Sequence, residues 1–367
     1  MANNSIVLLG CGDVGPIHEP MDIYSTLARP TFAAGDIRFA QVERVYSLRG
    51  AQQLNAGVGH SRLNPAMMSV FSDCGFNVVS LASNHAMDWG ADALLDSLDN
   101  FHKRGIQTVG AGANIEEARR PVIVEHNGVR VAMLAYCSIL NEGYAATAQR
   151  AGVAPLRIHT YYRPQESQPG VPPKIVTVPY EEDLKAMLDD IASAKRDNHG
   201  VVVSLHWGIH HIPKMIADYQ PLVADAAFKA GADLILGHHA HIPKAIGVHS
   251  GKVCFYSLSN FIMSATEKTP AQAAAFAARY GTNVDPEYPR MPYASDGKRS
   301  LIAKAVLSRD GATRVSFLPV LIDQQLRPEV LPSGDPRFDD ALRYMEWVSE
   351  GYAHRFAVSG DEVVVTD

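Results

Sequence analysis

Histidine is the residue type in this sequence with the clearest potential for chemistry. Of the 15 histidines in the chain, a group falls within two short segments, LHWGIHH and GHHAH: His206, His210, His211, His238, His239 and His241. Each segment ends an apolar run that predicts a β-strand, and strand ends of an open α/β sheet are where side chains converge on a ligand. His239 and His241 are alternate residues, so an extended backbone would present both imidazoles to one side. Because neutral imidazole is a common ligand of Zn, Fe and Mn, these segments predict a metal site rather than a solvated histidine-rich loop.

Three other predicted strand ends carry oxygen ligands or a further imidazole. Asp13 follows the run IVLLGCG, Glu43 follows IRFAQV, and Asn84 and His85 follow VVSLAS. The simpler alternatives are an ordinary turn at the Gly-Asp pair and a solvated edge carboxylate at Glu43. Together with His206, these carboxylate, amide and imidazole side chains have the composition of a dinuclear hydrolytic centre, in which one carboxylate bridges two ions.

The elements that must position these side chains are predicted from hydrophobic periodicity. Short apolar runs alternate with amphipathic stretches of helical length, which predicts an α/β fold. The predicted strands are Ser5–Cys11, Ile37–Val42, Val78–Ala82, Val122–Glu125, Val129–Tyr136, Val201–Leu205, Leu234–Leu236, Ala245–His249, Val253–Ser257, Ala303–Ser308 and Thr313–Leu318. The predicted helices are Ala91–Lys103, Glu181–Arg196, Tyr219–Lys229 and Pro336–Val348. Asn127-Gly128, Ser250-Gly251 and Asp310-Gly311 predict tight hairpin turns, so the sheets are expected to be mixed.

Several segments occur in an order and context that mark a family: GDVG, FAQVE, SNHAMDWG, HWG and AGADLILGHHAHIPKAI, followed by GKVCFYSLSNFI. In these segments the chain resembles the poly-γ-glutamate capsule-biosynthesis CapA family, across residues 5–262. That family is similar to a branch of the calcineurin-like metallophosphatase superfamily. The resemblance therefore implies a metallophosphatase-like αββα sandwich, in which two mixed β-sheets are flanked by helices.

The resemblance also implies roles for individual residues. The residues that match its metal-binding set, for two divalent ions (Mn, Fe or Zn), are Asp13, Glu43, Asn84, His206, His239 and His241. His85 resembles the histidine that gives a proton to the leaving group. The chain departs from the wider phosphatase pattern at Gly15, where that pattern has a histidine, and His18 is the nearby candidate to replace it. A ligand role for Gln41 is doubtful, because the capsule family has Asn-Leu-Glu where this chain has Gln-Val-Glu.

The tetrapeptide HIPK occurs twice, each time just after a segment that carries candidate ligands. Lys214 and Lys244, which end the two copies, are therefore predicted to offer positive charge to an anionic substrate, with His211 and His238 beside them. His238 has the alternative role of supporting a ligand from behind. The simpler alternative for both lysines is solvation, with the proline merely shaping each loop. Arg44, Arg49 and Tyr256 are outside candidates for the same substrate contacts.

These candidate side chains fit a metal-dependent hydrolase that activates water. The γ-glutamyl association of the resembled family favours an amide or other C–N bond in a small carboxylated substrate. The superfamily resemblance favours the alternative, a phosphoester, including that of a mononucleotide. An alternative of another class is a non-catalytic component of capsule or poly-γ-glutamate assembly.

The composition of the chain argues against certain classes of binding partner. The 33 lysines and arginines against 39 aspartates and glutamates give a formal charge of −6, which argues against binding to nucleic-acid polymers or acidic membranes. The apolar run Ile6–Leu9 is too short for a membrane span or a signal-peptide core, so a cytoplasmic location is expected. The four cysteines are scattered through apolar runs, and buried reduced thiols are expected.

We expect one catalytic domain over residues 1–330, interrupted by irregular insertions at 157–180 and 265–299. Long insertions of this kind are usually lids or subunit contacts, so we expect a lid or a contact of a homo-oligomer here, with a solvated loop as the simpler alternative. Residues 331–367 are predicted to form a helical extension that packs on the same domain.

Overall fold

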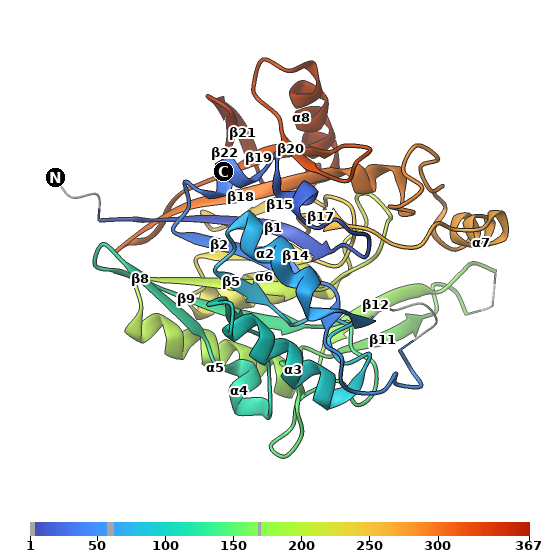
Figure 1. Ribbon diagram of the computed structural model, residues 1–367, viewed down its shortest axis with the longest axis horizontal. Coiled ribbons are helices and arrows are strands. Elements are labelled where there is room, and N and C mark those ends of the chain that lie inside the picture. Colours follow the sequence, from blue (N-terminus) through green and yellow to red (C-terminus); the bar gives the residue numbers. More distant parts are fainter. Residues whose placement is uncertain (1–3, 57–61, 168–169) are drawn as a thin grey trace.

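The computed structural model describes residues 4–56, 62–167 and 170–367. Its centre is two large β-sheets that lie face to face (Figure 1). One sheet has ten strands, in the order β21-β22-β19-β18-β1-β2-β5-β6, with β17 paired to β1 and β20 paired to β19. Its strands are β1 (Ile6–Gly15), β2 (Ile37–Val42), β5 (Val78–Ser80), β6 (Gln107–Val109), β17 (Asn260–Met263), β18 (Arg299–Ser308), β19 (Gly311–Ile322), β20 (Pro328–Val330), β21 (Arg355–Ser359) and β22 (Glu362–Thr366).

The second sheet has six strands, in the order β15-β16-β14-β13-β9-β8. They are β8 (Val122–His126), β9 (Val129–Cys137), β13 (Gly200–His206), β14 (Leu234–His238), β15 (Ile246–His249) and β16 (Lys252–Phe255). Both sheets combine parallel and antiparallel pairs, as predicted. All three predicted hairpins are confirmed, because β8 pairs with β9, β15 with β16 and β18 with β19, each antiparallel.

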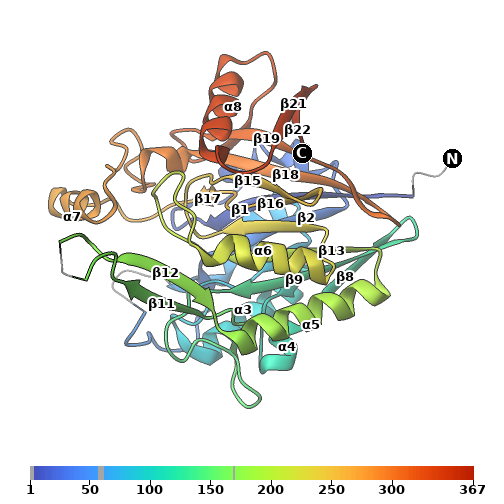
Figure 2. The ribbon, with the colours of Figure 1, turned by 180° about the vertical axis from the view of Figure 1, so that it is seen from behind.

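Helices cover the outer faces of the two sheets. Figure 1 shows α2 (Ser69–Cys74) and α3 (Gly90–His102) on the near side, and Figure 2, from behind, shows α5 (Glu181–Asp197) and α6 (Tyr219–Ala230) on the other. Side chains of β13 alternate between two cores: Val202 faces the core between the sheets, whereas Val201 and Val203 face α5 and α6. This alternation explains why the strand is apolar throughout. The predicted sandwich of two mixed sheets flanked by helices is confirmed.

The four long helices agree with their predictions to within one residue at each end. Three of them are α3, α5 and α6, and the fourth is α8 (Pro336–Ser349), which packs on β15 and β19. Gly231 adopts a left-handed conformation immediately after α6, at φ 119°, which is the stop signal that glycine supplies. Short elements complete the fold: α1 (Arg29–Phe32), α4 (Ile115–Arg119), and the strand pairs β3 (Val45–Tyr46) with β4 (Arg62–Leu63) and β7 (Ala111–Gly112) with β10 (Gly152–Val153).

The two predicted insertions contain regular structure. Within 157–180, β11 (Ile158–Arg163) pairs antiparallel with β12 (Lys174–Pro179), so the expectation of irregular chain there is wrong. Within 265–299, α7 (Pro270–Tyr280) begins at a capping box formed by Thr269 and Gln272. Figure 1 shows α7 and the β11–β12 pair projecting from the same side of the sandwich.

The C-terminal segment also differs from its prediction. Residues 331–367 contain α8 as expected, but β21 and β22 follow it as a hairpin, and β22 pairs with β19. The extension therefore adds strands to the ten-stranded sheet instead of being helical throughout. In the part of the chain that the structure describes, no helix combines the length and apolar character needed to cross a bilayer. All four cysteines are buried and unpaired, as predicted.

Candidate metal centre

Asp13 lies inside the long central strand β1, at a point where the strand is irregular. β1 pairs with β2 on one side and β17 on the other, and its register shifts around this residue. The backbone is unusually close to its neighbour here, because a Cβ on Gly12 would lie 1.9 Å from the carbonyl oxygen of Ser259. The backbone nitrogen of Asp13 donates to that same carbonyl at 3.0 Å. Glycine at position 12 therefore allows the contact that holds the Asp13 carboxylate in the interior.

His239 and His241 reach the site by a different route from the one predicted. β14 ends at His238, and the next segment is a loop in which His239 has φ 90° and His241 has φ 57°. The extended backbone expected for these residues is therefore wrong. Positive φ at non-glycine residues is strained and is concentrated at functional sites. The loop nevertheless brings both rings to the same cluster, with 6.4 Å between their centroids.

The predicted metal ligands gather in one cluster. Asp13, Glu43 and His206 each offer a ligand atom within 4.8 Å of those of the other two. His206 Nε2 lies 2.8 Å from Asn84 Oδ1, and His239 Nδ1 lies 3.2 Å from His206 Nε2. These separations are short enough for the side chains to share one or two ions.

His241 belongs to the same cluster, and its tautomer can be assigned. The amide nitrogen of Asn260 donates to the carbonyls of His241 and Gly297, so its Oδ1 accepts from His241 Nδ1 at 2.8 Å. The lone pair of Nε2 is then available, 3.9 Å from Glu43 Oε1. A metal-binding histidine commonly donates its other ring N–H in this way.

Burial favours the neutral state that imidazole ligands need, but it disfavours the charged state of the carboxylates. Burial lowers the pKa of His206, His239 and His241, and the neighbouring histidines lower it further. The three rings are therefore neutral near pH 7. Burial also raises the pKa of Asp13, and the charge of Glu43 adds to this effect. Two adjacent buried carboxylates without a cation are unfavourable, and divalent cations would relieve the repulsion.

Several buried polar atoms of the cluster lack hydrogen-bond partners, and these atoms show whether the cluster suits a bound cation. Among the described residues these atoms include Asp13 Oδ1, Glu43 Oε1 and His206 Nδ1. The other carboxylate oxygen of Glu43 accepts from Ser83 Oγ at 3.0 Å. An unsatisfied buried carboxylate oxygen is costly. The donor set of carboxylate, amide and imidazole therefore fits divalent first-row cations.

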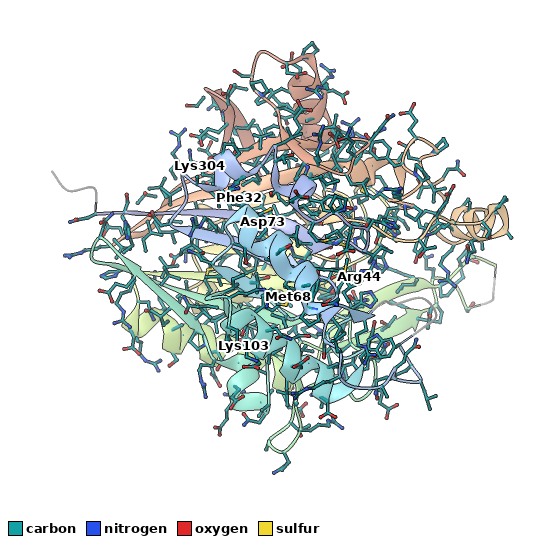
Figure 3. All side chains as sticks on the ribbon, in the orientation of Figure 1. Phe32, Arg44, Met68, Asp73, Lys103 and Lys304 are labelled. Carbon is teal, nitrogen blue, oxygen red and sulfur yellow. The ribbon has the colours of Figure 1, made fainter. Side chains whose placement is uncertain are left out.

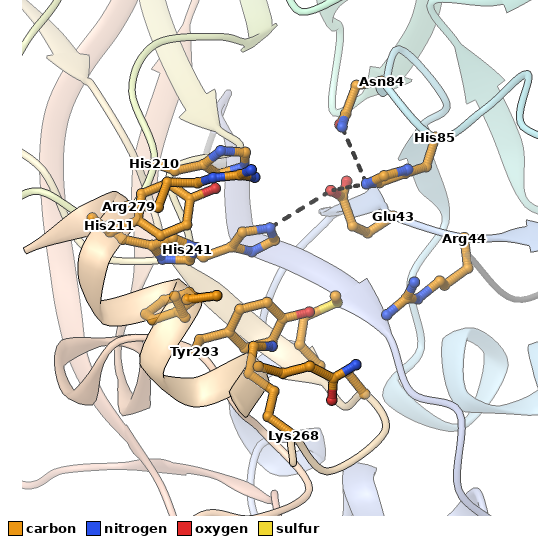
Figure 4. Close-up of a pocket in the computed structure, with 16 residues that line it drawn as sticks. Glu43, Arg44, Asn84, His85, His210, His211, His241, Lys268, Arg279 and Tyr293 are labelled. Atoms are coloured by element: carbon orange, nitrogen blue, oxygen red, sulfur yellow. Dashed lines mark hydrogen bonds and ion pairs between the residues drawn. The ribbon is translucent and has the colours of Figure 1, made fainter. Parts of the chain in front are cut away.

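His85 lies beside the cluster with its ring held from both sides. Nδ1 donates to Asp88 Oδ2 at 2.8 Å, and Nε2 lies 3.9 Å from Glu43 Oε1 and 3.1 Å from Asn84 Nδ2. Tyr144 Oη donates to the second oxygen of Asp88 at 2.9 Å. Figure 4 shows His85, Glu43 and Asn84 together on one side of the cavity.

The cluster opens into a cavity of about 540 Å³. Glu43, Asn84, His85 and His241 line the side of the cavity nearest the cluster, while α7 supplies part of the remaining wall (Figure 4). A cavity of this size suits a small molecule. Its remaining lining residues are Arg44, His210, His211, Met263, Ala265, Lys268, Gln272, Ala275, Phe276, Arg279, Tyr280 and Tyr293.

Of the four predicted substrate-binding residues, the structure places one at the cavity. His211 lines the cavity, whereas His238 is fully buried behind Asp13, with 3.7 Å between Nδ1 and Oδ1. Lys214 forms an ion pair with Glu350. Lys244 is 2% exposed and donates to the carbonyls of Ile212 and Met215. Neither lysine lines the cavity, so the predicted role of the two HIPK lysines is not supported.

The further candidates for substrate or metal contacts also differ in whether they lie at the cavity. Arg44 lines the cavity, but Arg49 pairs with Asp96 and Tyr256 stacks on Trp207 in the core. His18 lines a neighbouring cavity, where its Nε2 lies 3.3 Å from the carbonyl of Ala265. It therefore does not replace the histidine that is absent at position 15. The side chain of Gln41 donates to backbone carbonyls, and among the described residues no hydrogen bond joins it to a side chain of the cluster.

Sequence reasoning gave no role to several residues of the site. His210 was named in the histidine group of LHWGIHH but was assigned no function, and its ring centroid lies 3.8 Å from that of His239. Asp88 was visible in SNHAMDWG as a carboxylate three residues after His85. No sequence feature predicted a role for Lys268 or Arg279, because they lie in an alanine-rich segment that resembles no motif.

A two-sheet α/β sandwich with buried carboxylates and imidazoles at a cavity defines a candidate metal-binding protein of the α/β class. The chain belongs to the bacterial capsule synthesis protein PGA_cap family, whose model matches residues 13–265. This confirms the resemblance inferred from the motifs. Every predicted metal ligand lies within the matched residues.

Two relatives are similar over about half of the chain. The PGA biosynthesis protein CapA of Bacillus subtilis is 33% identical over 204 residues, which cover 55% of this chain and 47% of that protein. The capsule biosynthesis protein CapA of Bacillus anthracis is 31% identical over 207 residues, which cover 55% of this chain and 44% of that protein. The chain thus spans about half the length of the curated relatives it matches.

One solved structure with some similarity is the calcineurin-like phosphoesterase YfkN from Bacillus subtilis. It is 14% identical, with a TM-score of 0.35, and the comparison covers 89% of this chain and 88% of that one.

Proposed function

We propose that the protein is a metal-dependent hydrolase that acts on a small anionic molecule. The observation that carries the proposal is the set of buried carboxylate and imidazole atoms without hydrogen-bond partners, next to a cavity of about 540 Å³. A purely structural cluster would have its polar atoms paired within the protein. Here Glu43 lines the cavity, and Asp13 and His206 share the buried cluster with it.

Two divalent ions (Mn, Fe or Zn) would be held by the side chains that the family resemblance selects. The proposed ligands are Asp13, Glu43, Asn84, His206, His239 and His241. When bound, such ions supply an activated water and stabilise the negative charge that develops on the attacked group. Ser83 and Asn260 position this set by holding Glu43 and His241.

His85 is the proposed proton donor to the leaving group. It lines the cavity, and Asp88 fixes the orientation of its ring through Nδ1. Its Nε2 faces the cluster, 3.9 Å from Glu43. Imidazole is suited to this role because its ordinary pKa range lies near neutrality.

The proposed bond is an amide or other C–N bond in a carboxylated, γ-glutamyl-like molecule. The names of the relatives, which refer to PGA and capsule biosynthesis, support this substrate class. Hydrolysis of a phosphoester is the second candidate, because the same groups can activate water toward phosphorus. The alternative of another class is a non-catalytic part of capsule or poly-γ-glutamate assembly, which the relatives' names also fit.

The test begins with metal analysis of protein expressed in medium supplemented with Mn, Fe or Zn. The metal-loaded protein is then assayed with γ-glutamyl anilide and with an aryl phosphate. We expect bound metal in stoichiometric amount and turnover of the anilide that falls sharply in His85→Ala. Bound metal without turnover of either substrate would favour the assembly role, and turnover of the phosphate alone would favour the second candidate.

A further inference from the structure

The cavity has a cationic wall that lies outside the metal cluster. Arg44, Lys268 and Arg279 line it, whereas Glu43 is the single carboxylate among the described lining residues. Because Glu43 is a proposed metal ligand, no acidic side chain of the described lining remains to balance the three cations. Figure 4 shows Arg44, Lys268 and Arg279 at separate places around the cavity, so the cationic wall denotes these three side chains and not one continuous face.

Arg44 is the most constrained of the three. It is 9% exposed, and its guanidinium donates to the carbonyls of Gly15 and Ser264 at 3.4 and 3.1 Å. Within the described parts of the chain, no carboxylate forms an ion pair with it. Burial raises the pKa of the neighbouring Glu43, and the charge of Arg44 acts on that carboxyl to lower it. A buried guanidinium that forms no ion pair and borders a cavity is suited to an anionic ligand.

Lys268 and Arg279 complete the wall from the α7 region. Burial lowers the pKa of Lys268, and its Nζ lies 5.4 Å from the centre of the Phe276 ring. Neither cation forms an ion pair with a described residue. Phe276 anchors α7 in a small cluster with Ala240 and packs 5.0 Å from the ring of His211, so the helix has a fixed place beside the candidate ligands.

The positions of these cations in the chain also matter. Lys268 and Arg279 lie beyond residue 265, where the family match ends, whereas Arg44 and the proposed metal ligands all lie within it. Two of the three cations thus come from the segment at 265–299. Met263 from the matched part and Tyr293 from the segment at 265–299 also line the cavity.

We infer that the cationic wall formed by Arg44, Lys268 and Arg279 binds a carboxylate of the substrate at a distance from the bond that is cleaved. This inference rests on the proposed function and specifies its substrate: a small molecule with a carboxylate at one end and the reacting bond at the other. The wall selects for that carboxylate through charge-assisted hydrogen bonds.

The test is calorimetric binding of glutarate, a dicarboxylate, to the metal-loaded protein. Lys268→Gln and Arg279→Gln change side chains that contribute little to the core, and Lys229→Gln on α6 is a control with the same change in charge at an exposed site away from the cavity. We expect each wall variant to raise the dissociation constant about threefold to tenfold and the control to change it less than about twofold. Any contact between glutarate and the ions is common to all variants and cancels in these ratios.

Glutaramide, the neutral analogue of glutarate, tests whether charge is responsible. Its binding should be the same in the wild type and in both wall variants. The inference is overturned if the wild type shows no saturable binding of glutarate, if neither variant weakens binding, or if glutaramide binding weakens equally. It is also overturned if binding of inorganic phosphate, but not of glutarate, depends on both side chains, since the wall would then serve a phosphate group.

Failure of this inference can be distinguished from failure of the proposed function. Binding of glutarate is measured without any reaction, so an inactive protein can still show the charge-dependent ratios. Conversely, turnover of γ-glutamyl anilide with an unchanged KM in both wall variants and no change in glutarate binding would preserve the hydrolase and remove the wall from substrate recognition.

Discussion

His85 and Asp88 form a hydrogen bond in which Nδ1 of the imidazole donates to Oδ2 of the carboxylate at 2.8 Å. The two residues are three positions apart in a turn after β5, and Asp88 is 2% exposed. Tyr144 donates to the other oxygen of Asp88, so the carboxylate itself is held in place. The local sequence thus supplies both the proposed proton donor and the group that orients it.

The first prediction concerns Asp88 as a positioning residue. Asp88→Asn removes the charge that holds His85, so kcat for the accepted substrate should fall about tenfold to hundredfold while KM changes little. His85→Ala should lower kcat more, by about a hundredfold or greater. Steady-state kinetics with metal content measured in parallel checks both. Asp92→Asn, an exposed carboxylate on α3, is the control, and an equal loss in it would contradict the assigned role.

The second prediction concerns metal and stability. Ions that bind only the folded state stabilise it by about 2.7 kcal/mol when present at about a hundred times their dissociation constant. Chelation should therefore lower Tm by several degrees, and Asp13→Asn should reduce both the bound metal and this shift. His126→Ala alters a half-exposed imidazole away from the cluster and should keep the full shift. An identical Tm with and without chelator would argue against the site.

The fold was predictable where apolar spacing is local. Strands β13 and β14 are continuous apolar runs because both faces are buried, and the turn at Asn127-Gly128 has positive φ at both residues. The strands β11 and β12 were missed because the prolines between them and at the end of β12 indicated a loop. β22 was missed since its identity depends on pairing with β19, which is distant in sequence.

The site was predictable in its residue types but not in its geometry. Predicted strand ends were sufficient to select Asp13 and Glu43, which share the cluster with His206, although Asp13 lies within β1 and not at its end. The backbone at His239 could not be anticipated, because its positive φ depends on the surrounding packing. Arg279 was equally hidden, since an alanine-rich helix gives no indication of which cavity it borders.

The third prediction concerns the close contact beneath Asp13. A methyl group at position 12 would lie 1.9 Å from Ser259 O and 2.8 Å from Ser259 C, and both are backbone atoms that cannot move independently. Gly12→Ala should therefore destabilise the fold by about 2–3 kcal/mol and reduce metal binding by displacing Asp13. Gly334→Ala has no neighbour within 4 Å and serves as the control. Urea unfolding and metal analysis decide the matter, and unchanged stability would show that the contact is not tight.

The last prediction concerns Lys244, whose pKa burial lowers from 10.5 to about 7. Between these two values the folded protein holds the amine neutral while the unfolded chain is protonated. The unfolded state then binds more protons, so the free energy of unfolding rises with pH, by at most about 1.4 kcal/mol per pH unit. Below pH 7 both states are protonated and this slope disappears.

Lys244→Met removes the titrating group and isolates this effect. The free energy of unfolding of the wild type minus that of Lys244→Met should be constant below about pH 7 and should increase from about pH 7 to about pH 10. Denaturant unfolding of both proteins across this range, at equal metal concentration, measures the difference. A difference that stays flat above pH 7 would mean that the carbonyls of Ile212 and Met215 keep the amine protonated. The amine of Lys244 would then stay charged across this pH range and would link the two histidine-bearing loops by hydrogen bonds.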